Sequence, residues 1–164
     1  KIETELKEFL LKISVDNQTR VQTTNLPNKD IHCMMILDLD GFKIVNDRYG
    51  HPEGDILLKR IARELELVAG EENLVGRLGG DEFIFLFKYI TGTGEAANLA
   101  EKVHKVIGQI AKEDEKWSTV SVSIGVTMFN YETYSFKELY ERADKALYIA
   151  KKQGKDQVIF YEKM

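Results

Sequence analysis

Three groups of acidic residues stand where this sequence could support metal or phosphate chemistry. The first group, Asp38 and Asp40, ends an apolar run that begins at Ile31. A carboxylate beside an apolar core costs free energy unless it is paired or bound to a metal, and residues two apart on a strand face the same side. Mg²⁺ prefers such oxygen ligands together with phosphate oxygens. The alternative is a strand-end turn in which Asp40 bonds to its own backbone before Gly41.

The second acidic group is Asp81 and Glu82, which directly follow Gly79 and Gly80. Two glycines permit unusual backbone dihedrals and the close approach of a ligand. Adjacent acids repel each other unless a cation lies nearby. By itself, however, a Gly-Gly-Asp-Glu turn is more often a plain polar hairpin with exposed charges.

The third group contains Asn46, Asp47, His51 and Asp55. Asn and Asp side chains can read the edge of a guanine, because a carboxylate accepts from the ring N–H and the exocyclic amine. The alternative is that Asn46 and Asp55 cap helices. A loop histidine is more often a structural hydrogen-bonding group than a catalyst.

Basic residues accompany the acidic groups: Lys43 follows the first pair, and Lys151, Lys152 and Lys155 close the last long helical segment. They can bind phosphate, or they can simply suit the negative end of a helix. The sequence holds no Walker-type Gly-Lys-Ser, which excludes a P-loop.

These groups must be positioned by elements that the hydrophobic periodicity predicts. Helices are expected over 1–13, 52–69, 95–110 and 135–152, with a short helical turn around 43–47 and a loop over 14–30. Strands are expected over 31–39, 74–78, 83–89, 119–129 and 158–161. Ser135 and Glu138 form a capping-box pattern at the start of the last helix. Interleaved strands and helices predict an α/β fold, an α+β sandwich with helices against a central sheet.

The bulk properties exclude several classes of protein. The 164 residues fit one compact domain, and a net charge of -4 without a basic block does not suggest nucleic-acid binding. No apolar run could span a bilayer and no signal peptide is visible, so no membrane contact by this fragment is expected. Cys33 is the single cysteine, which rules out an internal disulfide and fits a reducing, cytoplasmic compartment. Because the chain starts at Lys1, we expect it to be a piece of a longer protein.

The acidic and basic groups belong to an ordered series of short motifs that spans about residues 31–161. The motifs are Asp38-Leu39-Asp40, Phe42-Lys43, Asn46-Asp47, Tyr49-Gly50-His51, Gly54-Asp55, Arg77-Leu78-Gly79-Gly80-Asp81-Glu82-Phe83, Ser121-Val122-Ser123-Ile124-Gly125-Val126 and Ala143-Asp144-Lys145-Ala146-Leu147-Tyr148, followed by Ala150-Lys151. This series resembles the GGDEF family of diguanylate cyclases, which act in bacterial second-messenger signalling.

The resemblance implies a fold like that of nucleotide cyclases and polymerase palms, with a mostly antiparallel central sheet flanked by helices. It also implies that two GTP molecules condense into cyclic di-GMP and two pyrophosphates. Two monomers would face each other across a two-fold axis, each 3′-hydroxyl attacking the α-phosphate of the other nucleotide. Residues 31–164 would be the catalytic domain, and residues 1–30 a helix and loop that can link it to an upstream sensory or regulatory domain. The full-length protein could be membrane-anchored, with this domain in the cytoplasm.

The resemblance also assigns roles to individual residues. Asp38 and Glu82 would bind Mg²⁺, or Mn²⁺ in its place, with the Leu39 carbonyl assisting and two metal ions in each active site. Asp81 would lie at the reaction centre, as a metal ligand or as a base for the 3′-hydroxyl. Asn46 and Asp55 would recognise guanine; the remaining GTP-binding positions would be Phe42, Lys43, His51, Lys151 and Lys155, with main-chain groups after Asp40 cradling the phosphates.

Three departures from the family pattern lead to further expectations. Many members carry an Arg-x-x-Asp product-inhibition site before the hairpin, but Gly70-Glu71-Glu72-Asn73 stands there, so no inhibition through that site is expected. Lys155 replaces the usual arginine after Gly154 and lacks its bidentate fork, which predicts lower GTP affinity. Thr24 to Lys29 resembles the family's opening segment, yet the helix that normally follows has no room before Ile31. Either the helix over 1–13 takes that place and a long loop intervenes, or residues are absent.

Two other functions remain open on the sequence. The chain could be a GGDEF module that binds GTP without turnover and regulates an attached domain. It could also make a mixed or adenine-containing dinucleotide. The intact Asp38, Asp81 and Glu82 favour an active cyclase, and Asp55 argues for guanine.

Overall fold

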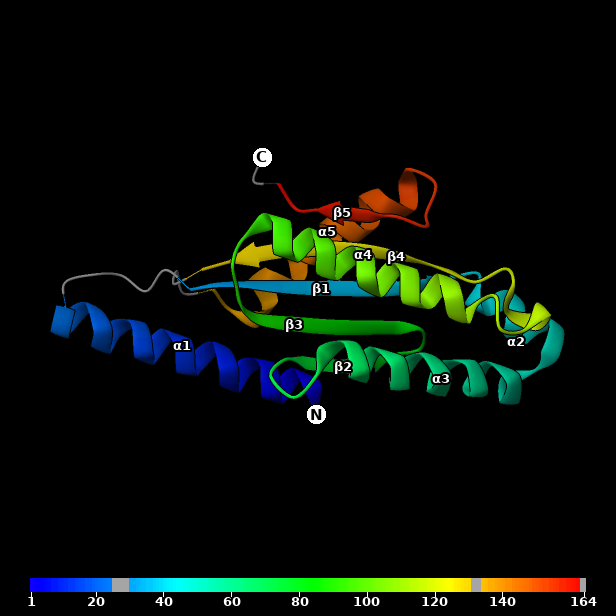
Figure 1. Ribbon diagram of the computed structural model, residues 1–164, viewed down its shortest axis with the longest axis horizontal. Helices are drawn as coiled ribbons and strands as arrows, with labels where there is room; N and C mark the ends of the chain where they lie inside the picture. Colours follow the sequence, from blue (N-terminus) through cyan, green and yellow to red (C-terminus); the bar gives the residue numbers. More distant parts are fainter. Residues whose placement is uncertain (25–29, 131–133, 163–164) are drawn as a thin grey trace.

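The computed structural model describes residues 1–24, 30–130 and 134–162. Its core is a five-stranded sheet in the order β2-β3-β1-β4-β5 (Figure 1). The elements in chain order are α1 (Ile2–Thr24), β1 (Ile31–Asp40), α2 (Phe42–Tyr49), α3 (His51–Ala69), β2 (Leu74–Gly79), β3 (Glu82–Ile90), α4 (Thr93–Ile110), the 3₁₀ turn η1 (Glu115–Trp117), β4 (Ser121–Phe129), α5 (Phe136–Lys152) and β5 (Val158–Phe160). Every pairing is antiparallel except that of β4 with β5. The expected sheet, mostly antiparallel and flanked by helices, is confirmed.

Strand β1 is the middle of the sheet and is covered on both faces. Side chains at odd positions from Cys33 to Leu39 pack with α3 and α4, whereas Met34 and Ile36 pack with α1 and α5. A strand buried on both faces has no polar side to alternate, which is why its sequence is apolar almost throughout. Within the described residues, no helix is long and apolar enough to cross a lipid bilayer.

A glycine lets the chain turn from β1 directly into α2. Gly41 has φ 74, in the left-handed region, and a side chain there would collide with the carbonyl oxygen of Thr119. The last residues of β1 and the first turn of α2 are therefore held side by side.

The N-terminal helix differs from the sequence-based prediction. The helix expected over 1–13 continues to Thr24, so the loop expected over 14–30 is wrong for residues 14–24. Ile2, Leu6, Leu10 and Ile13 are buried against the face of the sheet that α5 also covers. Of the two arrangements considered, the structure supports a helix that covers the sheet. The loop expected over residues 25–29 lies outside the described residues. The polar stretch after Ile13 misled the prediction because a helix segment that faces solvent needs no apolar stripe.

The other elements lie within two residues of their predicted bounds. The capping box is confirmed: Ser135 Oγ accepts from the Glu138 N–H at 3.2 Å, and Glu138 Oε2 accepts from the Ser135 N–H at 2.8 Å. The largest shift at a strand start is in β4, expected from residue 119. It begins at Ser121 because the Val120 N–H donates to the Trp117 carbonyl in a turn.

A candidate active site at the end of the central strand

The carboxyl end of β1 and the β2–β3 hairpin bring the acidic groups together. Asp38 and Glu82 are direct partners across β1 and β3, and the Leu39 N–H donates to the Asp81 carbonyl at 3.2 Å. The connecting turn needs Gly80, whose φ is 51. Two carboxylates that are 44 residues apart in the chain are thus held on one pair of bonded strands.

Arg77 braces this hairpin from within. Its Nε donates to the Gly80 carbonyl at 2.8 Å. The bond closes the turn over a bulge where the β2–β3 register shifts between Arg77 and Gly79. Bulges re-aim side chains next to functional sites, and here the bulge precedes both hairpin acids.

A lysine from the end of α5 completes the cluster. Lys151 Nζ lies 2.8 Å from Asp38 Oδ2, and the Asp38 side chain is 16% exposed. The structure therefore brings together Asp38, Asp81, Glu82 and Lys151, which the sequence places in three separate motifs.

The cluster carries more negative than positive charge. Burial, followed by the charge of Asp38, raises the pKa of Asp81 and also that of Glu82. Burial alone would lower the pKa of Lys151, but its hydrogen bond to Asp38 and the three acidic charges together raise it. Lys151 and Arg77 act against these three carboxylates, and Asp144 adds a further negative charge near Glu82, so the acids still outnumber the cations. Such a site favours an additional cation.

Asp40 has a different environment from Asp38. It is 7% exposed, and its Oδ2 accepts from Ser121 Oγ at 3.1 Å, Ser123 Oγ at 2.8 Å and the Asp156 N–H at 3.1 Å. The two acids of the first motif therefore divide their roles, with only Asp38 directed to the hairpin. In the part of the chain that the structure describes, no three His, Cys, Asp or Glu side chains are grouped so as to hold a metal by themselves.

The residues expected to read guanine lie where α2 meets α3. The Oδ1 atom of Asn46 is buried and has no hydrogen-bond partner, and it lies so close to Gly54 that a side chain at position 54 would collide with it and with the Phe42 ring. His51 is exposed on the first turn of α3, and Asp55 is exposed on the second. A buried acceptor without a donor is costly, so the Oδ1 atom of Asn46 is an uncompensated polar group at this place in the fold.

Two of the expected phosphate-binding lysines lie outside the acidic cluster. The Lys43 side chain is 89% exposed and pairs with Asp47 at 3.9 Å. Lys155 is exposed in the turn after α5, where its N–H donates to the Ala150 carbonyl at 2.9 Å.

Sequence reasoning missed the donors that hold Asp40. Ser121 and Ser123 are the β4 partners of Asp40 and Asp38, respectively. Their alternation in an otherwise apolar strand was a usable signal, because polar residues two apart share one face. The Asp156 N–H carried no such signal, since backbone donors are not visible in a sequence.

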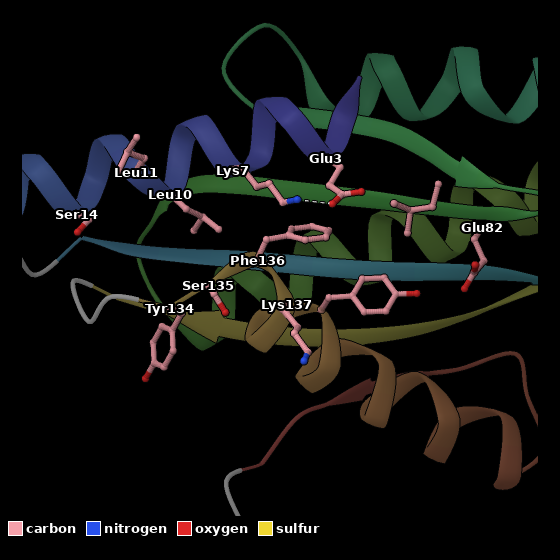
Figure 2. A pocket seen from close by; sticks show the side chains of 12 residues that line it. Glu3, Lys7, Leu10, Leu11, Ser14, Glu82, Tyr134, Ser135, Phe136 and Lys137 are labelled. Carbon is pink, nitrogen blue, oxygen red and sulfur yellow. Dashed lines mark hydrogen bonds and ion pairs between the residues drawn. The ribbon is translucent and has the colours of Figure 1, made fainter.

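A cavity of about 840 Å³ lies beside Glu82, between α1 and the start of α5. Leu10, Phe136 and Tyr140 line it, and Figure 2 shows Glu82 at one end and the Glu3–Lys7 pair, joined at 2.6 Å, along its upper side. Its lining includes Glu82 but not Asp38, so this cavity adjoins the acidic cluster without enclosing it.

Comparison with known proteins fits this geometry. The family model described as "Diguanylate cyclase, GGDEF domain" matches residues 12–157. This chain belongs to the GGDEF family. The GGDEF motif itself is the segment from Gly79 to Phe83, at the hairpin that pairs with β1.

Individual GGDEF proteins resemble it over most of its length. Diguanylate cyclase A of Treponema denticola is 32% identical over 154 residues, covering 93% of this chain and 41% of that protein. The bifunctional diguanylate cyclase/cyclic di-GMP phosphodiesterase MucR of Pseudomonas aeruginosa is 39% identical over 129 residues, 79% of this chain and 19% of that protein. The chain thus spans less than half the length of these relatives.

A solved GGDEF-family structure has the same fold. The active GGEEF domain of a diguanylate cyclase from Vibrio cholerae aligns with a TM-score of 0.71 at 26% identity, covering 93% of this chain and 96% of that one. The expected cyclase-type fold is confirmed.

At the position where the resemblance places a product-inhibition motif, Gly70 and Asn73 have structural roles instead. Asn73 Nδ2 donates to the Ala69 carbonyl at 2.9 Å, and its Oδ1 accepts from the Lys88 N–H at 2.8 Å, so its amide ties α3 to β3. Gly70 ends α3 with φ 65 and ψ -167, a conformation that an arginine would adopt only with strain.

Proposed function

We propose that this chain is a diguanylate cyclase domain, which condenses two GTP molecules into cyclic di-GMP and releases two pyrophosphates. The observation that carries the proposal is the pairing of Asp38 with Glu82 across β1 and β3, with Asp81 on the β2–β3 turn and Lys151 at 2.8 Å from Asp38. Phosphoryl transfer depends mainly on positioning and charge neutralisation, and these residues are suited to supply both.

The acidic cluster fits Mg²⁺, or Mn²⁺, as the proposed cofactor. Asp38 and Glu82 would hold it with the Leu39 carbonyl, two ions in each complete site. Protein Mg²⁺ sites commonly use one or two carboxylates and take their other ligands from substrate phosphates, so a triad of acidic side chains is not required. Burial, followed by the charge of Asp38, raises the pKa of Glu82, and a bound cation would oppose both effects. When bound, the metal would neutralise phosphate charge and favour ionisation of the attacking hydroxyl.

Asp81 is proposed to act at the reaction centre. Burial and the charge of Asp38 raise its pKa, which moves a carboxylate toward the range where a general base works well near neutral pH. Asp81 is therefore proposed as the base for the 3′-hydroxyl, with metal ligand as the alternative role.

GTP would bind along the end of β1, α2 and the start of α3. Asn46 and Asp55 would accept from the guanine edge, and the unpartnered Asn46 Oδ1 supports this. Gly41 begins α2 without a side-chain cap, leaving N–H groups of the first turn for phosphate. The flanking GTP contacts would come from Phe42, Lys43, His51, Lys151 and Lys155.

One domain holds only half of the reacting pair, so the active form is proposed to be a homodimer. An upstream sensory or regulatory domain would control that dimer in a cytoplasmic setting. The support is that the relatives are longer than this chain, which spans 41% of the Treponema denticola cyclase.

The direct test is to incubate the protein with Mg²⁺ and labelled GTP or ATP and to resolve the products. Cyclic di-GMP from GTP alone is expected. An adenine-containing dinucleotide would contradict the guanine assignment. GTP binding without product, at protein concentrations high enough to dimerise, would favour the regulatory module, for which the exposed Lys155 in place of an arginine is the supporting observation.

The same assay tests product feedback. Gly70 and Asn73 stand where the motif has its arginine and aspartate, and the Asn73 amide is already hydrogen-bonded to α3 and β3. Added cyclic di-GMP should therefore not inhibit at low concentration. Tight inhibition would require a different binding mode.

A further inference from the structure

The turn between α5 and β5 is held in an unfavourable backbone conformation. Lys155 has φ 65 and Asp156 has φ 48, both left-handed and neither of them glycine. Left-handed backbone is unfavourable for residues that carry a Cβ atom. Two in succession persist only where surrounding contacts determine the conformation.

Several hydrogen bonds hold this turn to the adjacent helices α4 and α5. The Lys155 N–H donates to the Ala150 carbonyl at 2.9 Å, Gln157 Nε2 donates to the Lys155 carbonyl at 3.2 Å, and the Asp156 carboxylate lies 2.8 Å from His104 Nε2 on α4. These tethers anchor the turn to α4 and α5, but none of them connects it to the strand that carries the acidic cluster.

The tether to that strand comes from Asp40. Its buried Oδ2 accepts from the Asp156 N–H at 3.1 Å while Ser121 and Ser123 orient the same oxygen from β4. The serines leave the carboxylate little rotational freedom, so a fixed acceptor on β1 determines where the Asp156 backbone lies.

We propose that Asp40 is a positioning residue for nucleotide binding, which holds the Lys155–Asp156 turn and so sets where the Lys155 ammonium meets the triphosphate. This inference rests on the proposed cyclase function. The end of β1 would then align two cations with its two carboxylates, Lys151 directly through Asp38 and Lys155 indirectly through Asp40.

The first test measures whether Asp40 holds the turn and needs no catalysis. In the unmodified protein, the Asp156 amide should exchange with deuterium slowly, like a strand amide, although its side chain is 61% exposed. In Asp40→Asn the same amide should exchange at least tenfold faster, because an amide oxygen is a weaker acceptor than a carboxylate. Fast exchange in the unmodified protein would overturn the proposal even if the variant did not fold.

The second test asks whether the effect reaches the nucleotide through Lys155. Asp40→Asn should raise the KM for GTP about tenfold, the loss expected for a hydrogen bond to a charged group, with kcat within about threefold of the unmodified protein. In a Lys155→Ala background the same substitution should leave KM nearly unchanged. Equal effects in both backgrounds would show that Asp40 does not act through Lys155.

Ser121→Ala is a graded comparison, because it removes one of the two serine donors that orient Asp40 while Ser123 and the Asp156 N–H still bind Oδ2. It should raise the exchange rate and KM by less than Asp40→Asn does; a rise in KM without faster exchange of the Asp156 amide would overturn the assignment. If the unmodified protein makes no cyclic di-GMP, the proposed function fails, whereas the exchange measurement still decides whether Asp40 holds the turn.

Discussion

The two ends of β1 shift the pKa values of their polar side chains in opposite directions. At the carboxyl end, Asp38 faces Asp81 and Glu82 with Lys151 as the nearby cation, and burial with mutual repulsion raises the pKa of both hairpin acids. At the other end, His32 is 1% exposed, and burial lowers its pKa to about 4.

The imidazole at the His32 end is buried among aromatic rings. Aromatic rings of Phe9, Tyr89 and Phe129 surround the imidazole at centroid distances of 5.2, 5.0 and 5.2 Å. Its Nδ1 accepts from the Tyr89 N–H at 3.1 Å, which requires that nitrogen to be unprotonated. This cage also fastens α1 to the sheet, because Phe9 belongs to that helix.

The difference teaches how one strand can serve both stability and chemistry. Within the aromatic cage of Phe9, Tyr89 and Phe129, the Nδ1 atom of His32 already has a backbone donor. The acidic end leaves charge uncompensated, which costs stability and is the expected sign of a site that binds something.

The largest expected effect is loss of activity at the acidic end. Asp81→Ala should lower the rate of cyclic di-GMP formation at least about 100-fold, because the proposed base is removed, while melting shows an intact fold. As a control, Glu72→Ala alters an exposed acid outside the cluster and should retain activity. Normal turnover by Asp81→Ala would remove its assigned role.

The core between α1 and the sheet should respond in stability rather than in activity. Leu6→Ala removes a fully buried side chain of α1 and should cost about 3 kcal/mol of unfolding free energy. Leu11→Ala, on the same helix but 67% exposed, should cost under about 0.5 kcal/mol. Urea denaturation measures both. Similar midpoints for the two variants would mean that α1 does not contribute to the folded core.

The cage should make stability depend on pH with a defined sign. The folded pKa of His32, about 4, lies below the ordinary 6.5, so between these values the unfolded state binds more protons. Stability should therefore fall as the pH drops from 6.5 to 4, by about 2 to 3 kcal/mol, and then stop changing through this group.

The control for this pH effect is His32→Gln, which keeps an acceptor for the Tyr89 N–H but cannot titrate. Asp30 and Lys88 lie within the electrostatic reach of His32 and remain in both proteins. Equal pH slopes for the variant and the unmodified protein would show that His32 is not the group responsible.

The smallest effect should have the opposite sign at the acidic end. Since the folded pKa of Glu82 is raised above 4.5, the folded state binds more protons just above that value, and this contribution improves stability as the pH falls. Without metal at pH 7, Glu82→Gln should stabilise the protein by under about 1 kcal/mol, after allowing for solvent screening. The gain should shrink toward pH 4.5 in thermal melts; a gain that grows there would contradict the charge excess.

Much of the fold could be predicted because its signals are local. The helical spacing in α3, α4 and α5, the capping box at Ser135 and the paired glycines of the hairpin each act over a few residues. The N-terminal helix was underestimated, since its second half has no apolar stripe to reveal it.

The sequence by itself determined that acids, glycines and lysines of a GGDEF domain occur in the right order, because motif identity and spacing are properties of the chain. Only the tertiary structure decided that Asp38 pairs with Glu82 and Lys151 while Asp40, two residues away on the same face, turns to Ser121 and Ser123. The physical reason is that a carboxylate's role depends on which donors and charges the neighbouring strands bring to it, and strand pairing joins residues that lie tens of positions apart.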